Sequence, residues 1–127
     1  DYGHHPTEME STIEALKHIT KGNLFVIFQP HRYTRTEKLY ERFVSALSKA
    51  DYSIILDIYS AGEDPIPGIS SKVLLEEHKQ DNIQYMNSSK KVIEYLSESL
   101  AEGDTVLTLG AGDITLMGPK IMELLND

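Results

Sequence analysis

Two short polar stretches hold the residues of this chain that are best suited to chemistry: DYGHHPTE at residues 1–8 and FQPHRYTRT at residues 28–36. In the first, the Asp1 carboxylate can accept hydrogen bonds from hydroxyl groups such as those of a ribose, and the Tyr2 ring can stack on a base. The two imidazoles that follow exchange protons near neutral pH. These residue types favour a ligand-binding loop over an ordinary polar turn, whereas adjacent histidines without acidic partners argue against a metal site.

The second stretch places Arg32 and Arg35 three residues apart at the start of a predicted helix. Thr34, followed by Glu37 three residues later, is typical of a capping box. Two guanidinium groups beside free helix N–H groups form a receptor for a carboxylate or a phosphate, because arginine binds such anions through paired hydrogen bonds. The alternative is that Arg35 forms an ion pair with a glutamate of the same helix, such as Glu41, and binds no ligand.

Two further loops carry weaker signals. Prolines and glycines shape residues 57–70, where Glu63 and Asp64 either contact a ligand or face solvent. LGAGD at residues 109–113 lacks the third glycine of a dinucleotide fingerprint, so close packing of a strand against a helix accounts for it better than a pyrophosphate site does. The sequence contains no GxxxxGK(S/T) loop, and it therefore has no recognisable means of holding ATP phosphates by itself.

The hydrophobic residues alternate along the chain between helical spacing and short continuous runs. Helical spacing predicts helices over Thr7–Thr20, Arg35–Lys49, Ser70–Lys79, Ser89–Ala101 and Leu116–Leu125. Continuous apolar runs predict strands over Leu24–Phe28, Ser53–Leu56, Ile83–Met86 and Thr105–Leu109. The first helix is expected to begin at a capping box formed by Thr7 and Glu10.

Continuous apolar strands between helices are typical of a parallel sheet that is covered on both faces. We therefore expect an α/β fold of the Rossmann-like, doubly wound type, with a mainly parallel sheet flanked by helices and all four strands in its interior. A further strand is expected just before Asp1. Ligands of such sheets bind at the carboxyl ends of the strands, where the loops are 1–5, 29–35, 57–68 and 110–113.

The composition predicts a single acidic domain. The chain has 127 residues and a net charge of -8, and its lack of cysteine excludes disulfides and thiolate chemistry and fits a cytoplasmic location. Residues 1–50 carry seven Lys or Arg against six Asp or Glu, whereas residues 51–127 carry five against fourteen. This balance argues against a nucleic-acid partner, and a local basic cluster suits a small anion. No apolar run is long enough for membrane insertion.

Taken together, DYGHHPTE, FQPHRYTRT, YSAGEDPIPGIS and LGAGD resemble, in the same order, the C-terminal domain of the UDP-N-acetylmuramate–L-alanine ligases of the Mur ligase family. The four stretches span nearly the whole chain. The related murein-peptide ligases have a different loop where Tyr2–Gly3 and His31–Arg32 stand here, which makes them the weaker match.

The resemblance implies the third domain of an ATP-dependent ligase of peptidoglycan synthesis, with ATP and Mg²⁺ held mainly by the central domain. Such enzymes phosphorylate the carboxylate of UDP-N-acetylmuramate, and the amine of L-alanine then attacks the acyl phosphate. By resemblance, Asp1 and Tyr2 would face the nucleotide. The residues that would face the alanine carboxylate and the charge at the acyl phosphate are His4, His31, Arg32 and Arg35.

The family usually shows a second acid directly before Asp1, so we expect residues 1–127 to be one domain of a longer, three-domain enzyme. We expect this domain alone to be inactive. The alternative interpretation is a free-standing α/β module that binds a small anionic metabolite or a protein partner.

Overall fold

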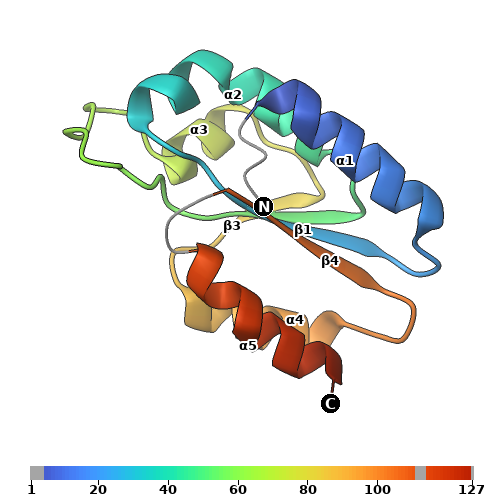
Figure 1. Ribbon diagram of the computed structural model, residues 1–127. Coiled ribbons are helices and arrows are strands. Elements are labelled where there is room, and N and C mark those ends of the chain that lie inside the picture. Colours follow the sequence, from blue (N-terminus) through green and yellow to red (C-terminus); the bar gives the residue numbers. More distant parts are fainter. Residues whose placement is uncertain (1–4, 111–113, 127) are drawn as a thin grey trace.

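Helices and strands alternate along the chain in the order that the hydrophobic pattern predicts (Figure 1). The computed structural model describes residues 5–110 and 114–126. The helices are α1 (Pro6–Ile19), α2 (Tyr33–Leu47), α3 (Ser71–Glu77), α4 (Ser89–Ser99) and α5 (Ile114–Asn126). The strands are β1 (Leu24–Gln29), β2 (Tyr52–Ile55), β3 (Ile83–Tyr85) and β4 (Thr105–Gly110). Every helix and strand expected within residues 7–125 is therefore present, with ends displaced by a few residues.

The described strands form one parallel sheet in the order β3-β2-β1-β4, which confirms the α/β, Rossmann-like expectation. β1 is fully buried between its neighbours, with Phe25 paired to Tyr52 on one side and to Val106 on the other. The expectation that all four strands are interior is wrong for β3 and β4, which are the edges of the described sheet. A continuous apolar run indicates that helices cover a strand on both faces. Because helices can cover the faces of an edge strand in the same way, the run does not show that a strand is interior. The strand expected before Asp1 lies outside the described residues.

Helices cover the sheet on both faces (Figure 1). α1, α2 and α3 lie on one face, where Val26 and Phe28 of β1 pack in a core with Phe43 of α2. α4 and α5 lie on the other, where Phe25 and Ile27 join a second core. Successive side chains of a strand point to opposite faces, so one apolar run supplies both cores. None of the helices in the described part of the chain is long and apolar enough to cross a membrane.

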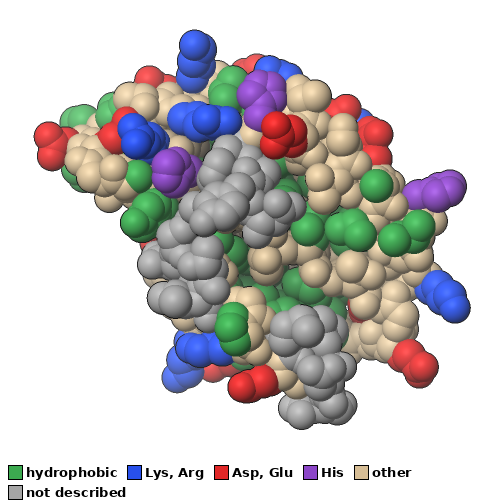
Figure 2. All heavy atoms as spheres, viewed as in Figure 1, with side chains coloured by type: hydrophobic (Ala, Val, Ile, Leu, Met, Phe, Trp, Pro, Cys, Tyr) green, Lys and Arg blue, Asp and Glu red, His purple; other side chains and the backbone are tan. Residues whose placement is uncertain are grey.

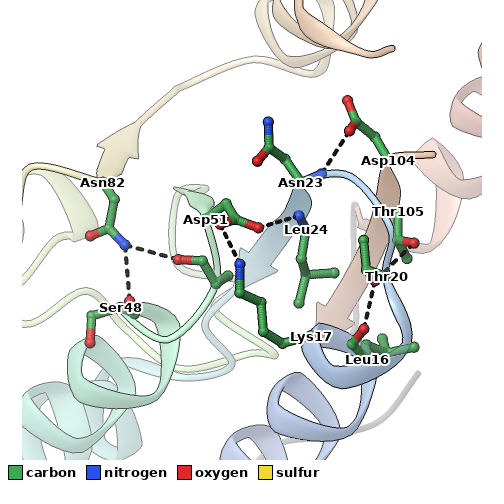
Figure 3. Close-up of polar contacts among 11 residues, drawn as sticks. Leu16, Lys17, Thr20, Asn23, Leu24, Ser48, Asp51, Asn82, Asp104 and Thr105 are labelled. Atoms are coloured by element: carbon green, nitrogen blue, oxygen red, sulfur yellow. Dashed lines mark hydrogen bonds and ion pairs between the residues drawn. The ribbon is translucent and has the colours of Figure 1, made fainter. Parts of the chain in front are cut away.

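At the amino ends of the strands, charged and amide side chains bind the connecting backbone (Figure 3). Asp51 forms an ion pair with Lys17 and accepts a hydrogen bond from the Leu24 N–H at 2.6 Å. Although burial raises the pKa of Asp51, these two contacts outweigh it and hold the pKa below its usual value. Asp104 accepts from the Asn23 N–H at 2.7 Å. The polar side chains at the amino ends of the strands thus bind the protein's own backbone. The cavities described below lie at the carboxyl ends.

The start of α1 differs from the expected capping box. The helix begins at Pro6, and the N-cap is His5, whose Nδ1 accepts a hydrogen bond from the Thr7 N–H at 3.1 Å. Proline suits the first helical position because its missing N–H would have no partner there. The Thr7 hydroxyl instead accepts a hydrogen bond from Arg42 Nη2 of α2 at 3.0 Å. The prediction of a capping box formed by Thr7 and Glu10 is therefore wrong.

Candidate functional site

A cavity of about 670 Å³ lies beside the carboxyl end of β1 and the first turn of α2. Its lining is mostly basic, and Figure 2 shows Lys, Arg and His side chains gathered over the start of α2. We call it the cationic groove; the residues that line it are His5, His31, Arg32, Thr34, Arg35, Lys38 and Leu39. Its charge and size suit a small anionic ligand.

The cationic groove brings together three residues that the sequence singled out, His31, Arg32 and Arg35. It also includes Lys38, one helical turn beyond Arg35, and His5, the cap of α1. Sequence reasoning missed Lys38, although its spacing from Arg35 on one helix could have indicated it. Three other candidates, Asp1, Tyr2 and His4, lie outside the described residues.

His31 is attached to the loop that follows β2. His31 and Tyr59 form a parallel β-bridge, the Arg32 N–H donates to the Tyr59 carbonyl at 2.7 Å, and the Tyr59 N–H donates to the Pro30 carbonyl at 2.9 Å. Burial lowers the pKa of His31, and the charges of Arg32 and Arg35 lower it further, against an opposing effect of Glu63. At neutral pH His31 is therefore a neutral imidazole that offers hydrogen bonds and no full charge.

Glu63 caps α2, and the expected capping box of Thr34 with Glu37 is wrong. The helix begins at Tyr33, and its N-cap residue, Arg32, provides no side-chain hydrogen bond. Glu63 Oε1 accepts from the N–H groups of Tyr33 at 2.6 Å and Thr34 at 3.3 Å, and Glu63 Oε2 accepts from the Thr34 hydroxyl at 2.7 Å. The sequence left Glu63 open between a ligand contact and a solvated loop residue, and the structure gives it this third role.

Arg35 has an unsatisfied donor. Its Nε is buried and has no hydrogen-bond partner among residues 5–110 and 114–126. The alternative, an ion pair of Arg35 with a glutamate of the same helix, is not formed among the described residues, and Glu41 lies 3.5 Å from His78 Nε2. Buried polar groups in folded proteins nearly always have partners. A guanidinium N–H without one, in the wall of a basic cavity, is a suitable donor to a bound anion.

Gly110 brings the end of β4 close to β1. Its φ is +119°, and a Cβ there would lie 2.4 Å from the Gln29 carbonyl oxygen. A close approach of backbone is therefore found at this glycine, but it is between two neighbouring strands and not between a strand and a helix as the sequence predicted, because Gly110 pairs with Gln29 in the sheet. Residues 111–113 lie outside the described part of the chain. The Gln29 side chain, 2% exposed, accepts from the Ile114 N–H at 2.9 Å and donates to the Asp57 carbonyl at 3.1 Å.

A second cavity, of about 270 Å³, lies near α4 and α5 at the same end of the sheet. Of the site residues expected from the sequence, none of those that the structure describes lines this cavity; its described lining consists of Gln29, Leu56, Asp57, Asn87, Ser88, Ser89, Met117 and Lys120. Nor do the described residues include any group of three His, Asp or Glu side chains that could hold a metal ion. The predicted site residues that the structure describes, His31, Arg32 and Arg35, all line the cationic groove.

The sequence of this chain is similar to the sequences of known proteins. Residues 1–112 match the family described as Mur ligase, glutamate ligase domain. The chain is 45% identical over 130 residues to a UDP-N-acetylmuramate–L-alanine ligase of Geotalea daltonii, and 42% identical over 130 residues to one of Pelotomaculum thermopropionicum. Each match covers 100% of this chain, and the chain spans 28% of the length of each relative.

A solved structure shows the same fold. The UDP-N-acetylmuramate-alanine ligase of Thermotoga maritima superposes with a TM-score of 0.69 at 23% identity, over 99% of this chain and 26% of that one.

Proposed function

Because this chain belongs to the Mur ligase family, as a glutamate ligase domain, we propose that it is the C-terminal domain of a three-domain enzyme that joins L-alanine to UDP-N-acetylmuramate in peptidoglycan synthesis. The relatives that match its whole length carry that name and extend well beyond it. In this proposal the enzyme works in the cytoplasm, and this domain supplies contacts to the amino acid and the nucleotide.

The observation that carries the proposal is the buried Nε of Arg35, which has no partner among residues 5–110 and 114–126 and belongs to a residue that lines the cationic groove together with Arg32 and Lys38. Guanidinium groups bind carboxylates and phosphates through charge-assisted hydrogen bonds. We assign to Arg32 and Arg35 the orientation of the L-alanine carboxylate and the stabilisation of negative charge at the acyl phosphate. His4, which lies outside the described residues, is proposed to act beside them.

In the proposed reaction, phosphoryl transfer from ATP first converts the carboxylate of UDP-N-acetylmuramate into an acyl phosphate. The amine of L-alanine then attacks the acyl carbon, the bond from that carbon to the phosphate oxygen breaks, and inorganic phosphate leaves as the amine gives up a proton. Negative charge gathers on the acyl and phosphate oxygens, which is the charge that fixed cationic donors stabilise. His31, neutral at pH 7, contributes hydrogen bonds at this site and helps to orient the amino acid.

The cationic groove does not fit a magnesium ion. Its lining is basic, Mg²⁺ prefers carboxylate and water oxygens, and the described residues hold no cluster of acidic groups that could bind a metal. We therefore assign Mg²⁺ and most of the ATP contacts to the rest of the proposed enzyme, with Asp1 and Tyr2 touching the nucleotide.

The test is ligation by the full-length protein that contains this chain. We expect ADP and phosphate release that requires both L-alanine and UDP-N-acetylmuramate, together with formation of the amide product. Activity with another amino acid in place of L-alanine would overturn the substrate assignment. A full-length protein that binds an anion in the groove and catalyses no ligation would favour the free-standing binding module.

A further inference from the structure

We propose that Glu63 is a positioning residue that orients Arg32 and Arg35 in the cationic groove by binding the N-terminus of α2 with its own carboxylate. The inference rests on the proposed function, since the arginines it orients are those assigned to L-alanine and the acyl phosphate. It goes beyond that function because Glu63 faces the helix backbone and does not itself line the groove.

The contact geometry is that of a cap supplied from a distant loop. The first N–H groups of a helix have no partner within the helix, and negative charge near them is favourable. Here one carboxylate accepts three hydrogen bonds, from the Tyr33 N–H, the Thr34 N–H and the Thr34 hydroxyl, at 2.6, 3.3 and 2.7 Å. Both residues lie between Arg32 and Arg35, so the carboxylate fixes the backbone that carries the two guanidinium groups.

Arg32 needs such support because its backbone is strained. Its φ is 70° and its ψ is 143°, a conformation that residues with a side chain rarely adopt and that persists only when the surroundings impose it. Hydrogen bonds on both sides of Arg32 act on this segment. The Arg32 N–H donates to the Tyr59 carbonyl at 2.7 Å, the Arg32 carbonyl accepts from the Thr36 hydroxyl at 2.6 Å, and Glu63 binds the next N–H along the chain.

The loop that carries Glu63 is shaped to return it to α2. Ala61 and Gly62 both have positive φ, of 51° and 90°, and the Glu63 N–H donates to the Ser60 carbonyl at 3.0 Å. Together with the Tyr59 contacts, this turn ties the loop after β2 to the loop after β1 on both sides of Arg32.

Occupation of the helix N-terminus has a consequence for the ligand. With the N–H groups of Tyr33 and Thr34 bound to Glu63, these donors are not available to an anion in the groove. Side chains therefore take the place of these two donors in binding a ligand carboxylate or phosphate, first among them Arg35, whose Nε has no partner among the described residues. Loss of the Glu63 carboxylate would misplace the arginines and weaken amino-acid binding without removing any ligand contact.

The test compares Glu63→Ala and Glu63→Gln with Asp64→Asn, in the full-length protein. Asp64 is the adjacent acid and is exposed, so it is a matched control for charge. We expect Glu63→Ala to raise KM for L-alanine roughly tenfold, with a smaller change in kcat, because orientation of the amino acid is lost. Glu63→Gln keeps an oxygen acceptor for the helix N–H groups, so its KM for L-alanine should lie close to the wild-type value. Asp64→Asn should leave KM unchanged.

A second readout, hydrogen exchange at the Tyr33 and Thr34 amides, does not depend on activity. We expect both amides to exchange faster in Glu63→Ala than in Asp64→Asn. If Glu63→Ala fails to fold, Thr34→Val, which removes one of the three hydrogen bonds, should give an intermediate KM and faster exchange. A wild-type protein that does not ligate L-alanine would contradict the proposed function and leave the exchange test of Glu63 intact. An active wild type, with Glu63→Ala matching Asp64→Asn in both KM and exchange, would overturn this inference.

Discussion

The rings of His31 and Tyr59 stack with their centroids 5.8 Å apart and their planes inclined by 26°, directly beside the β-bridge that joins the two residues. The bridge links the loop after β1 to the loop after β2, so the backbone of both loops and one wall of the cationic groove form a single unit. Tyr59 is 38% exposed, so part of its side chain is accessible to solvent.

Removal of the Tyr59 ring tests this link. Tyr59→Ala keeps the backbone bridge and deletes the stacked pair, and we expect it to lower the free energy of unfolding by about 0.5–1.5 kcal/mol. Tyr59→Phe retains the ring and should be nearly neutral. Denaturant unfolding of the two variants makes the comparison. Equal destabilisation by both would show that the hydroxyl, and not the stacking, matters.

Loss of either arginine of the groove should impair catalysis in the full-length protein. For Arg32→Ala we expect kcat/KM for L-alanine to fall roughly ten- to a hundredfold, equivalent to about 1.5–3 kcal/mol, because a charge-assisted contact is lost. Arg35→Lys should recover only part of the activity, since lysine keeps the charge and loses the planar fork.

Arg42→Ala is the control for the arginine variants. Arg42 is an exposed arginine of the same helix that contacts the Thr7 hydroxyl. Its replacement should therefore lower the free energy of unfolding by less than about 1 kcal/mol. Thermal melts would check folding in each variant. Kinetics near wild type for Arg32→Ala and Arg35→Lys would show that neither arginine belongs to the site. His4 and His31 would then be the remaining candidates for the site residues.

Alanine at Gly110 should destabilise the fold. The added Cβ would lie 2.4 Å from the Gln29 carbonyl oxygen, at a backbone φ of +119°, and we expect a loss of about 1–3 kcal/mol of unfolding free energy. Gly118→Ala is the matched control, because a Cβ there meets nothing within 4 Å and alanine is the better helix former. Chemical denaturation of both variants decides the point, and a neutral Gly110→Ala would contradict the close-packing account.

The contribution of Glu63 should depend on pH. Hydrogen bonding from the Thr34 hydroxyl, and less strongly from the helix N–H groups, lowers the pKa of Glu63 below 4.5 despite some burial. A carboxyl whose pKa is lower in the folded state stabilises the protein above its unfolded pKa, and this effect is lost as the pH falls through the folded value. The stability advantage of wild type over Glu63→Gln should therefore be constant near neutrality and shrink below about pH 4.5. Thermal unfolding of both proteins across this range measures it, and a difference that grows on acidification would have the wrong sign.

The 127-residue chain by itself should neither ligate nor hydrolyse ATP, because its sequence has no phosphate-binding loop. We expect only weak nucleotide binding, through Asp1 and Tyr2. Titration calorimetry with ATP and Mg²⁺ tests this expectation. Micromolar affinity would mean that residues 110–113 hold phosphates after all.

Local patterns in the sequence determined the elements and the residues that cluster at one end of the sheet. The apolar run of β1 indicates burial on both faces of the strand, and Arg32 and Arg35 are three residues apart at the start of a helix. Each of these features depends on only a few neighbouring residues, so it can be recognised in the sequence. Sequence reasoning also predicted close packing at the glycine turn after β4, although it expected a helix as the partner and Gly110 lies against the backbone of β1.

Only the tertiary structure decided how the loops meet. A helix N-terminus is satisfied equally well by a neighbouring threonine or by a carboxylate 29 residues away, so a local capping rule could not choose Glu63 over Glu37 for Thr34. The strained backbone of Arg32 and the bridge from His31 to Tyr59 depend on the same long-range folding of one loop onto another. Nor does an apolar run distinguish a central strand from an edge strand, because helices cover the faces of both, whereas hydrogen bonding to a second neighbouring strand depends on the order of the strands in the sheet.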